Sequence, residues 1–317
     1  MTQTATNTKT KTKKAYKLHE LITDMSSAEY HGTEGTYSSS QLKDLVDDEG
    51  LFIKKYILNE IPREEVAAFD VGTYFHTGVL EPHKLKMECV VFPGKVRRGK
   101  EWDSFKEKNK DKVIVSSSQK DQAEGLVKSV LECKMAKEFI TGTPEVSLFT
   151  DVAVHDGEIF APYFNRKLTI DGWVTQILTE KPEVVFVIKV RSDTLGDTFI
   201  SDLKSTTGNA RSNISMRKKI SDYTYDLSAS LYLDMFSLMR PTLREFVWIF
   251  ASKDYYNCRV YKATENNIKV GRAKYMKALI KLADCKKNNW EVIDFVDTLE
   301  PLPYELEHLI IKDKDLL

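Results

Sequence analysis

The spacing of apolar residues changes partway along this 317-residue chain, and this change limits the folds that the chain can adopt. Before about residue 145 apolar side chains recur at helical spacing, as from Glu64 to Leu80. From Glu145 onward the pattern is that of strands, with short turns such as His155-Asp156-Gly157 between β-rich runs. Helical spacing returns from Tyr223 to Met239. The alternation predicts an α/β fold.

The same patterns divide the chain into a short tail and one domain. Residues 1–25 are rich in Thr and Lys and nearly free of large apolar side chains, which predicts a flexible, basic N-terminal tail. Residues 26–317 contain no repeat and no convincing linker, so we predict a single domain. The expected strands are 147–154, 159–163, 167–171, 184–190, 198–203, 246–251 and 258–261.

Composition excludes several classes of protein. The chain has 47 basic and 47 acidic side chains, so any site for a polyanion must come from local clustering. No apolar stretch approaches the length of a membrane span, and the first residues lack the apolar region of a secretory signal. The four cysteines fit neither a CxxC metal site nor a disulfide framework. We therefore expect a cytoplasmic protein.

The segment from Gly94 to Lys100 matches the GxxxxGK pattern of a phosphate-binding loop. The match is incomplete, because Glu101 stands where a Ser or Thr hydroxyl would hold Mg²⁺. Several Lys and Arg side chains also crowd the loop, where a compact nest of backbone amides would be needed. We predict no nucleotide hydrolysis here. The loop is instead expected to contact a nucleic-acid backbone through Arg97, Arg98 and Lys100.

An acidic residue, one intervening residue and a lysine follow a strand at Asp202-Leu203-Lys204. Alternate residues of a strand point to the same side, so the carboxylate and the ammonium lie side by side. Phosphodiester cleavage uses such a pair, since carboxylates hold a divalent ion and a cation stabilises charge on the phosphate. Two similar triplets, at Glu132 and Asp284, lie in helical patterns and lack this geometry. Taken alone, the triplet is also typical of an ion pair on an edge strand.

Neighbouring residues strengthen the case for chemistry at this triplet. Asp171 ends another predicted strand and Glu145 begins one, so both carboxylates can converge on Asp202. From residue 203 to 221 there is no acidic side chain, whereas Lys204, Arg211 and three further basic residues occur there. Carboxylates beside a one-sided basic stretch suit a polyanion handled with a bound metal. A solvated basic loop remains the alternative explanation.

Several blocks of the chain resemble the RecE (exonuclease VIII) group of phage and prophage exonucleases, in the RecB-like branch of the PD-(D/E)XK nuclease superfamily. The most specific block runs from Gly72 to Pro82 and matches the signature GT-x-FH-xxx-LEP. The other matching blocks follow in the family's order between about residues 28 and 290: Tyr30-His31, 37–42, 97–102, 145–147, Asp171, 201–206 and 225–232.

The resemblance implies a role for each matching residue. His76, Asp171 and Asp202 would bind metal with the Leu203 carbonyl, Lys204 would be the catalytic lysine, and Glu145 would join the catalytic carboxylates. The residues expected to contact DNA are Arg97, Arg98, Lys100, Arg211, Tyr225, Ser228 and Tyr232. The chain departs from the family at Ser228, where Gln is usual, and in the 31 residues that separate Asp171 from Asp202. The run 184–190 is interpreted as an insertion there.

The resemblance also implies a fold and a function. The fold would be a restriction-endonuclease-like core, with a mixed β-sheet flanked by helices. The activity would be Mg²⁺-dependent digestion of linear double-stranded DNA from its ends, 5′ to 3′, with Mn²⁺ as a substitute ion. A ring-shaped homo-oligomer (trimer or tetramer), a phage recombination role and a single-strand annealing partner in the bacterial host cytoplasm are implied as well. The alternatives are an endonuclease, a Cas4-like nuclease, or an inactive DNA-binding module of the same fold.

Overall fold

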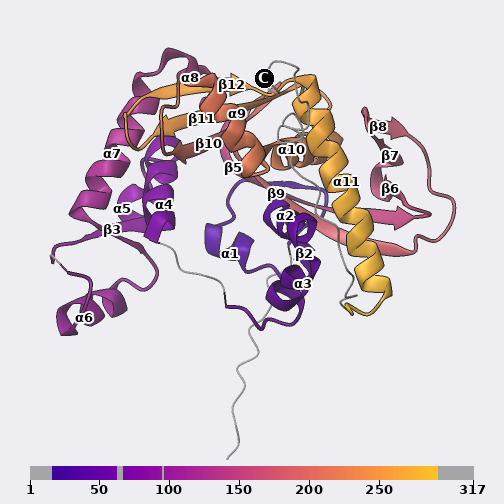
Figure 1. Cartoon of the computed structure of the whole chain (residues 1–317), viewed down its shortest axis with the longest axis horizontal. Helices are drawn as coiled ribbons and strands as arrows, with labels where there is room; N and C mark the ends of the chain where they lie inside the picture. The colour runs from indigo at the N-terminus through magenta and orange to yellow at the C-terminus, as the bar shows by residue number, and fades with distance from the viewer. Residues whose placement is uncertain (1–15, 63–66, 95, 292–317) are drawn as a thin grey trace, which may run out of the picture.

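A computed structural model of the chain describes residues 16–62, 67–94 and 96–291 (Figure 1). The helices are α1 (Ser27–His31), α2 (Ser39–Asp47), α3 (Glu49–Phe52), α4 (Ala67–Leu80), α5 (Leu85–Glu88), α6 (Lys100–Lys108), α7 (Ser117–Glu132), α8 (Lys134–Phe139), α9 (Asn213–Asp222), α10 (Tyr225–Met239) and α11 (Glu265–Lys287). The strands are β1 (Leu21–Ile22), β2 (Thr36–Tyr37), β3 (Cys89–Phe92), β4 (Val113–Ser116), β5 (Thr143–His155), β6 (Glu158–Ala161), β7 (Arg166–Thr169), β8 (Gly172–Thr175), β9 (Val184–Leu195), β10 (Phe199–Thr206), β11 (Glu245–Ser252) and β12 (Cys258–Lys262).

Most strands form one large mixed sheet in the order β12-β11-β10-β9-β5-β6-β7-β8, with β1 beside β5 and β2 beside β9. The pairing is mostly antiparallel, but β10 and β11 are parallel and are joined through α9 and α10. Parallel neighbours require such a crossover, so the chain must carry α10 across the sheet directly after the Asp-x-Lys strand. The predicted α/β fold with a mixed sheet flanked by helices is confirmed.

Two helical layers bury opposite faces of β10 and β11. Strand β11 shows this by alternation, because Trp248 and Phe250 belong to the core under α10 whereas Val247 and Ile249 belong to the core under α4 and α7. The sequence of a strand that is buried on both faces is a continuous run of apolar residues, as it is in β11. In Figure 1 α4 and α7 accordingly lie on one side of β10 and β11, with α10 and α11 on the other.

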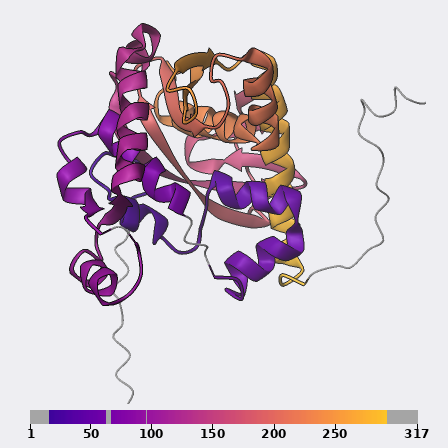
Figure 2. The same ribbon diagram turned by 60° about the vertical axis from the view of Figure 1, so that its left-hand side comes forward.

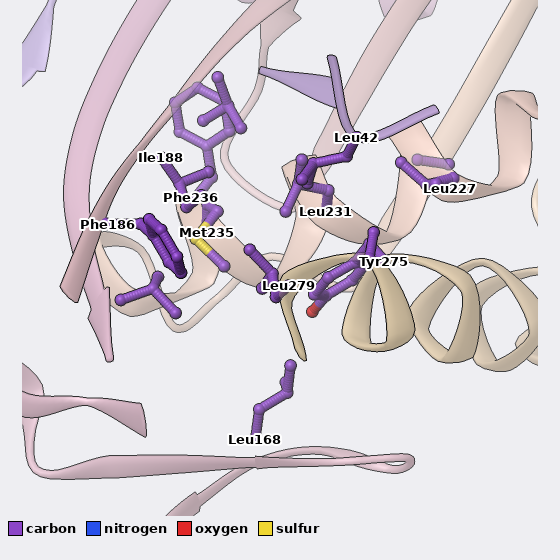
Figure 3. Close-up of a cluster of buried hydrophobic side chains, with 14 of the residues drawn as sticks. Leu42, Leu168, Phe186, Ile188, Leu227, Leu231, Met235, Phe236, Tyr275 and Leu279 are labelled. Atoms are coloured by element: carbon purple, nitrogen blue, oxygen red, sulfur yellow. The ribbon is translucent and has the colours of Figure 1, made fainter. Parts of the chain in front are cut away.

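The larger core lies where α2, α10 and α11 meet the sheet. Figure 3 shows Leu42 of α2, Leu231 of α10 and Leu279 of α11 in one cluster. The inward positions predicted for α10 are confirmed, since Leu227, Leu231 and Met235 are fully buried. Burial of each such side chain contributes roughly 1.5–3 kcal/mol, so these helices are held mainly by packing. Figure 2 shows α2 and α11 running close together beside the sheet.

Several predicted boundaries were wrong. The tail was predicted to reach residue 25, but Leu21 pairs with Leu148 of β5 and the His19 amide donates to Phe149 at 2.8 Å. Residues 1–15 lie outside the described residues, as does the predicted start of α4 at Glu64. The run 184–190, interpreted as an insertion, is most of β9, a central strand of the sheet.

Among the described residues, no helix combines the length and apolar character needed to cross a lipid bilayer.

Helices α10 and α11 are joined by a buried polar network and a very close backbone approach. The Arg272 guanidinium donates to both carboxylate oxygens of Asp234 at 2.7 Å, and the Tyr275 hydroxyl donates to the same carboxylate at 2.5 Å. Directly before Arg272, the position of a Cβ on Gly271 would lie 2.0 Å from the Asp226 carbonyl oxygen. Only glycine therefore fits at this helix crossing.

We expect Gly271→Ala to destabilise the protein, although alanine is the better helix former, because the added methyl would collide with the backbone of α10. The expected loss is about 1–3 kcal/mol of unfolding free energy, measured by urea denaturation. Gly72→Ala in α4 is the matched control, because no atom lies within 4 Å of the added Cβ. It should gain about 0.5–1 kcal/mol. Equal effects at the two positions would contradict this account of the crossing.

Candidate active site

The β9–β10 hairpin brings two carboxylates opposite each other. Its ladder contains the pairs Ile200↔Leu195 and Ser201↔Thr194, and the next pair in register would be Asp202 with Asp193. The regular ladder ends there. The Asp193 carboxylate instead accepts the Leu203 amide at 2.6 Å, where a backbone carbonyl would otherwise be expected. The two strands separate beyond this point, and the carboxylates lie in the opening.

A third carboxylate comes from β5 on the other side of β9. The ladder pairs Pro144↔Thr194 and Val146↔Ser192, which leaves Glu145 opposite Asp193. Glu145 has a left-handed backbone with φ of +52°, a conformation that costs roughly 1–3 kcal/mol in a residue with a side chain. This strain interrupts the ladder at the residue that carries the carboxylate. Glu145, Asp193 and Asp202 therefore form a row across three adjacent strands.

Helix α4 adds an imidazole to this row. His76 Nδ1 lies 3.4 Å from Asp193 Oδ2, and one ligand atom each from His76, Glu145 and Asp193 lie within 4.8 Å of one another. The helix is anchored by Phe75 and Val79, which are buried in the core beneath α7. The helical repeat therefore leaves His76 facing the opening of the sheet. The imidazole thus lies beside Asp193 of β9, the residue opposite Asp202, whereas metal binding by His76 stays a prediction.

Lys204 completes the cluster from β10. Its ammonium donates to Asp202 Oδ1 at 2.6 Å and lies 5.4 Å from the centroid of the Tyr225 ring at the start of α10. Burial alone would lower the pKa of Lys204, but the carboxylates of Asp202 and Asp193 raise it above its usual range. Lys204 is therefore a permanent cation at neutral pH. Both members of the predicted Asp-x-Lys pair share one side of the strand, as expected.

The carboxylates lie in an environment that disfavours their charged form. Burial, followed by the charge of Asp193, raises the pKa of Glu145 to about 7. Burial also raises the pKa of Asp202, with Asp193 adding to the rise and Lys204 opposing it. Arg191 compensates part of this charge, since its Nε lies 2.7 Å from Glu145, and it is fixed in turn above the Tyr30 ring at 5.3 Å. The cluster is therefore short of positive charge.

These residues fit a divalent cation. Carboxylate oxygens are the preferred ligands of Mg²⁺ and Mn²⁺, and a neutral imidazole is accepted more readily by Mn²⁺ than by the harder Mg²⁺. A cation bound between these groups would offset their mutual repulsion. It would also explain why the strained backbone at Glu145 is maintained. Leu203 lies at the same point with its amide bonded to Asp193, whereas a metal contact of its carbonyl stays a prediction. The donor set is that of a hard metal site.

Asp171, predicted to be the second metal aspartate, lies elsewhere. It sits in the turn between β7 and β8, where its side chain is 72% exposed and pairs with Lys269 of α11 at 2.9 Å. It belongs to no cluster of metal-type ligands among the described residues. Asp193 occupies the position that was expected for Asp171. The prediction failed because the strand carrying Asp193 was thought to end at Val190 and to be an insertion.

One signal in the sequence pointed to Asp193. Gly196-Asp197 begins a turn between two strand-like runs, which predicts a hairpin. Residues equally distant from the centre of such a turn face each other, so Asp202 required a partner between about residues 191 and 193. The aspartate found there, after the buried Ser192, breaks the apolar pattern that was used to place strands.

The residues expected to contact DNA have different surroundings. Arg97 is used internally, because it donates to Asp70 at 3.2 Å and Gln119 at 2.6 Å and lies over the Trp102 ring. These contacts tie the loop to α4 and α7, which contradicts an exposed role for Arg97. Arg98, Lys100 and Arg211 are exposed, and Tyr225, Ser228 and Tyr232 are half-buried on α10. For these six residues DNA contact stays a prediction.

A second group of metal-type ligands lies at the far end of β5. His155, Asp156 and Glu183 have ligand atoms within 4.8 Å of one another. Glu183, however, is already paired with Lys287, and His155 lies 3.3 Å from Glu180. Asp156 is largely exposed and so is solvated without an ion. This group has the features of a surface ion-pair network.

The raised pKa of Glu145 predicts a pH effect on the stability of metal-free protein. Between pH 4.5 and about 7 the folded state holds a proton that the unfolded state has lost, so stability falls as the pH rises and stays low above 7. We expect Glu145→Gln to raise the unfolding free energy at pH 8 in EDTA by roughly 1–3 kcal/mol, and the gain to vanish near pH 4.5. Urea denaturation at both pH values measures this.

Added Mg²⁺ should reverse the order of stability, because the wild type gains binding energy that the variant lacks. A variant that is less stable than the wild type in EDTA at pH 8 would show instead that the Arg191 ion pair outweighs the burial of Glu145.

Comparison with solved structures shows a shared fold. A protein from Eubacterium rectale, provisionally described as an exonuclease, superposes with a TM-score of 0.51 at 15% identity, covering 90% of this chain and 99% of that chain. Scheffersomyces stipitis Rai1, solved with (3′-NADP)+ and calcium ion, aligns over 77% of this chain and 65% of that chain at 11% identity, but its TM-score of 0.23 carries no argument. No curated protein sequence matches the chain.

A family model agrees with the geometry. The model described as a PDDEXK-like domain of unknown function (DUF3799) matches residues 38–293. The matched range contains the whole cluster: His76, Glu145, Asp193, Asp202 and Lys204. The acidic residue, intervening residue and lysine that the name of this fold describes correspond to Asp202, Leu203 and Lys204. The chain belongs to the PDDEXK-like DUF3799 family, within the PD-(D/E)XK nuclease superfamily.

Proposed function

We propose that the protein is a metal-dependent exodeoxyribonuclease that hydrolyses phosphodiester bonds at the ends of linear double-stranded DNA. The observation that carries this proposal is the row of Glu145, Asp193 and Asp202, with Lys204 bonded to Asp202 at 2.6 Å. A site that only bound DNA would gain nothing from clustered carboxylates, because they repel phosphate. The proposed ion is Mg²⁺, with Mn²⁺ as a substitute.

Each residue of the cluster has a distinct part in this chemistry. Glu145, Asp193 and Asp202 would hold the ion, with His76 beside them. When bound, the ion would lower the pKa of an attacking water and neutralise charge on the phosphate. Lys204 stays protonated and stabilises the negative charge that develops on the phosphate oxygens during attack.

The surrounding residues keep this arrangement in place. The Leu203 amide fixes the Asp193 carboxylate at 2.6 Å, so that oxygen does not have to reorganise when substrate arrives. Arg191 holds Glu145 from the side of β9. The Tyr225 ring lies 5.4 Å from the Lys204 ammonium and limits its position.

The finer features of the proposal rest on the resemblance to RecE-like exonucleases, carried chiefly by the block from Gly72 to Pro82. They are 5′ to 3′ polarity, a ring-shaped homo-oligomer that keeps the enzyme on its substrate, and a role in phage recombination beside a single-strand annealing protein. Digestion in one direction would expose the single strand that such an annealing protein binds.

The mutational test separates Asp193 from Asp171. Asp193→Asn, Asp202→Asn and Lys204→Ala should each lower the rate of Mg²⁺-dependent hydrolysis about a thousandfold or more, since each removes charge that binds the ion or stabilises the transition state. Asp171→Asn is the matched control, because its carboxylate is 72% exposed and paired with Lys269. It should keep activity within about twofold of wild type. Thermal melts show whether the variants fold.

Near-normal turnover by Asp193→Asn, together with loss of activity in Asp171→Asn, would overturn the structural assignment and restore the one expected from the sequence.

The substrate test compares linear and covalently closed circular duplexes of the same sequence, with Mg²⁺ or EDTA. An exonuclease should degrade only the linear duplex and only with metal, because the closed circle offers no end. Strand-specific labels at the 5′ and 3′ ends report the polarity. Cleavage of the circle would identify an endonuclease, and binding without cleavage of either form would identify an inactive DNA-binding module.

A further inference from the structure

An exposed aromatic ring lies beside the proposed active site, at the junction of α9 and α10. Tyr223 is 56% exposed, and its ring stacks on the Tyr225 ring with centroids 5.5 Å apart and planes inclined by 22°. Tyr225 in turn lies 5.4 Å from the Lys204 ammonium. The chain thus forms a short ladder of rings that leads from the catalytic lysine to solvent. The outer ring, Tyr223, has no role in the cluster of carboxylates.

The backbone between the two rings is held in an unfavourable conformation. Thr224 has a left-handed backbone with φ of +50°, and its side chain makes no capping hydrogen bond although it is the N-cap of α10. Threonine is poorly suited to this conformation because of its branched Cβ. The turn directs Tyr223 outward and keeps its ring parallel to Tyr225. Strain of this kind concentrates at binding sites, where the surrounding structure maintains it.

A lysine with no carboxylate partner lies at the same place. Lys43 of α2 donates to the Tyr223 carbonyl at 3.0 Å and lies 5.2 Å from the centroid of the Tyr225 ring. Its neighbours Lys204 and Lys274 are paired with Asp202 and Asp226, whereas no described carboxylate lies within 4.0 Å of Lys43. Burial, followed by the charge of Lys204, lowers the pKa of Lys43 to about 8, with Asp202 and Asp226 opposing this shift. Among the described residues Lys43 therefore has no carboxylate in direct contact.

A second basic side chain lies at the outer ring. Lys219 of α9 lies 5.8 Å from the centroid of the Tyr223 ring, and its ammonium donates to Thr207 Oγ1 at 3.2 Å. Cations thus lie beside both rings of the ladder, and the outer ring is accessible. Aromatic faces interleaved with cations are the arrangement that binds single-stranded nucleic acid, because bases stack on the rings and phosphates pair with the cations.

We propose that Tyr223 and Lys43 form a nucleotide-binding subsite for the single-stranded end of the DNA, a site that extends the proposed nuclease function and rests on it. The base of a nucleotide next to the scissile phosphodiester stacks on the Tyr223 ring, and its phosphate binds Lys43. An internal base of a duplex has both faces covered by its neighbours, so its nucleotide must leave the stack before it can bind here, and only a base at an end has a free face. The subsite therefore selects frayed or single-stranded ends and tolerates any sequence.

The experiment uses a DNA duplex with a short single-stranded tail that carries 2-aminopurine, with Ca²⁺ in place of Mg²⁺ to suppress hydrolysis. Fluorescence anisotropy gives the affinity, and quenching of 2-aminopurine reports stacking. Tyr223→Ala should weaken binding about tenfold and abolish quenching. Tyr223→Phe keeps the aromatic face and should restore both. Tyr255→Ala is the matched control, because Tyr255 is 63% exposed in the β11–β12 turn, and it should change neither.

An abasic tail makes the test specific to stacking. Wild type should bind an abasic tail as weakly as Tyr223→Ala binds the normal tail, and the variant should lose nothing further on the abasic tail. Lys43→Met should reduce the slope of log affinity against log salt by about one, and Lys43→Arg should preserve it. Unchanged affinity and quenching in Tyr223→Ala, or equal wild-type affinity for normal and abasic tails, would overturn the subsite.

Failure of the subsite can be told from failure of the nuclease function. The binding measurements do not depend on hydrolysis, so an inactive protein with a Tyr223-dependent, base-dependent affinity would support the subsite and contradict the nuclease. Hydrolysis of linear DNA in Mg²⁺ at wild-type KM by Tyr223→Ala would support the nuclease and contradict the subsite.

Discussion

Electrostatic repulsion within one row of carboxylates is the constraint on which the rest of the structure depends. Glu145, Asp193 and Asp202 lie on three adjacent strands, largely out of water, where like charges interact strongly. The fold meets this repulsion with cations from separate elements, Arg191 from β9 and Lys204 from β10. These cations do not fully balance the row, as the raised pKa values of Glu145 and Asp202 show. The remaining imbalance favours a bound metal.

The helices around this row are fixed by buried contacts. Helix α4 is anchored in one core and α10 in the other, so the imidazole and the aromatic ladder approach the row from opposite sides of β10. The buried pair of Asp234 and Arg272 joins α10 to α11, and breaking such a pair typically costs 3–5 kcal/mol because it leaves an uncompensated charge. Gly271 sets how closely these helices approach.

The sequence predicted which chemical groups form the site better than it predicted how they are arranged. The α/β fold and the Asp-x-Lys strand followed from local patterns, which depend on residues close together in the chain, whereas His76 was expected only from the resemblance of its block to RecE-like exonucleases. Asp193 was missed because its role depends on the register of a hairpin, and hydrophobic periodicity does not report register once polar residues enter a buried strand. Arg97 was misjudged for a related reason. Its partners Asp70 and Gln119 are distant in sequence, so a half-buried guanidinium with internal partners looked like a solvated one.

The β9–β10 hairpin also restricts how this family can diverge. Asp193 and Asp202 meet because each stands the same number of residues from the centre of the turn, which lies between Asp197 and Thr198. A single insertion or deletion between them would shift the register and turn one carboxylate to the opposite face of the sheet. The β7–β8 turn that carries Asp171 contributes no ligand to the row, so its length is not tied to this register. Evolution can therefore remodel that edge of the sheet, whereas the length of the segment from 193 to 202 must be inherited unchanged.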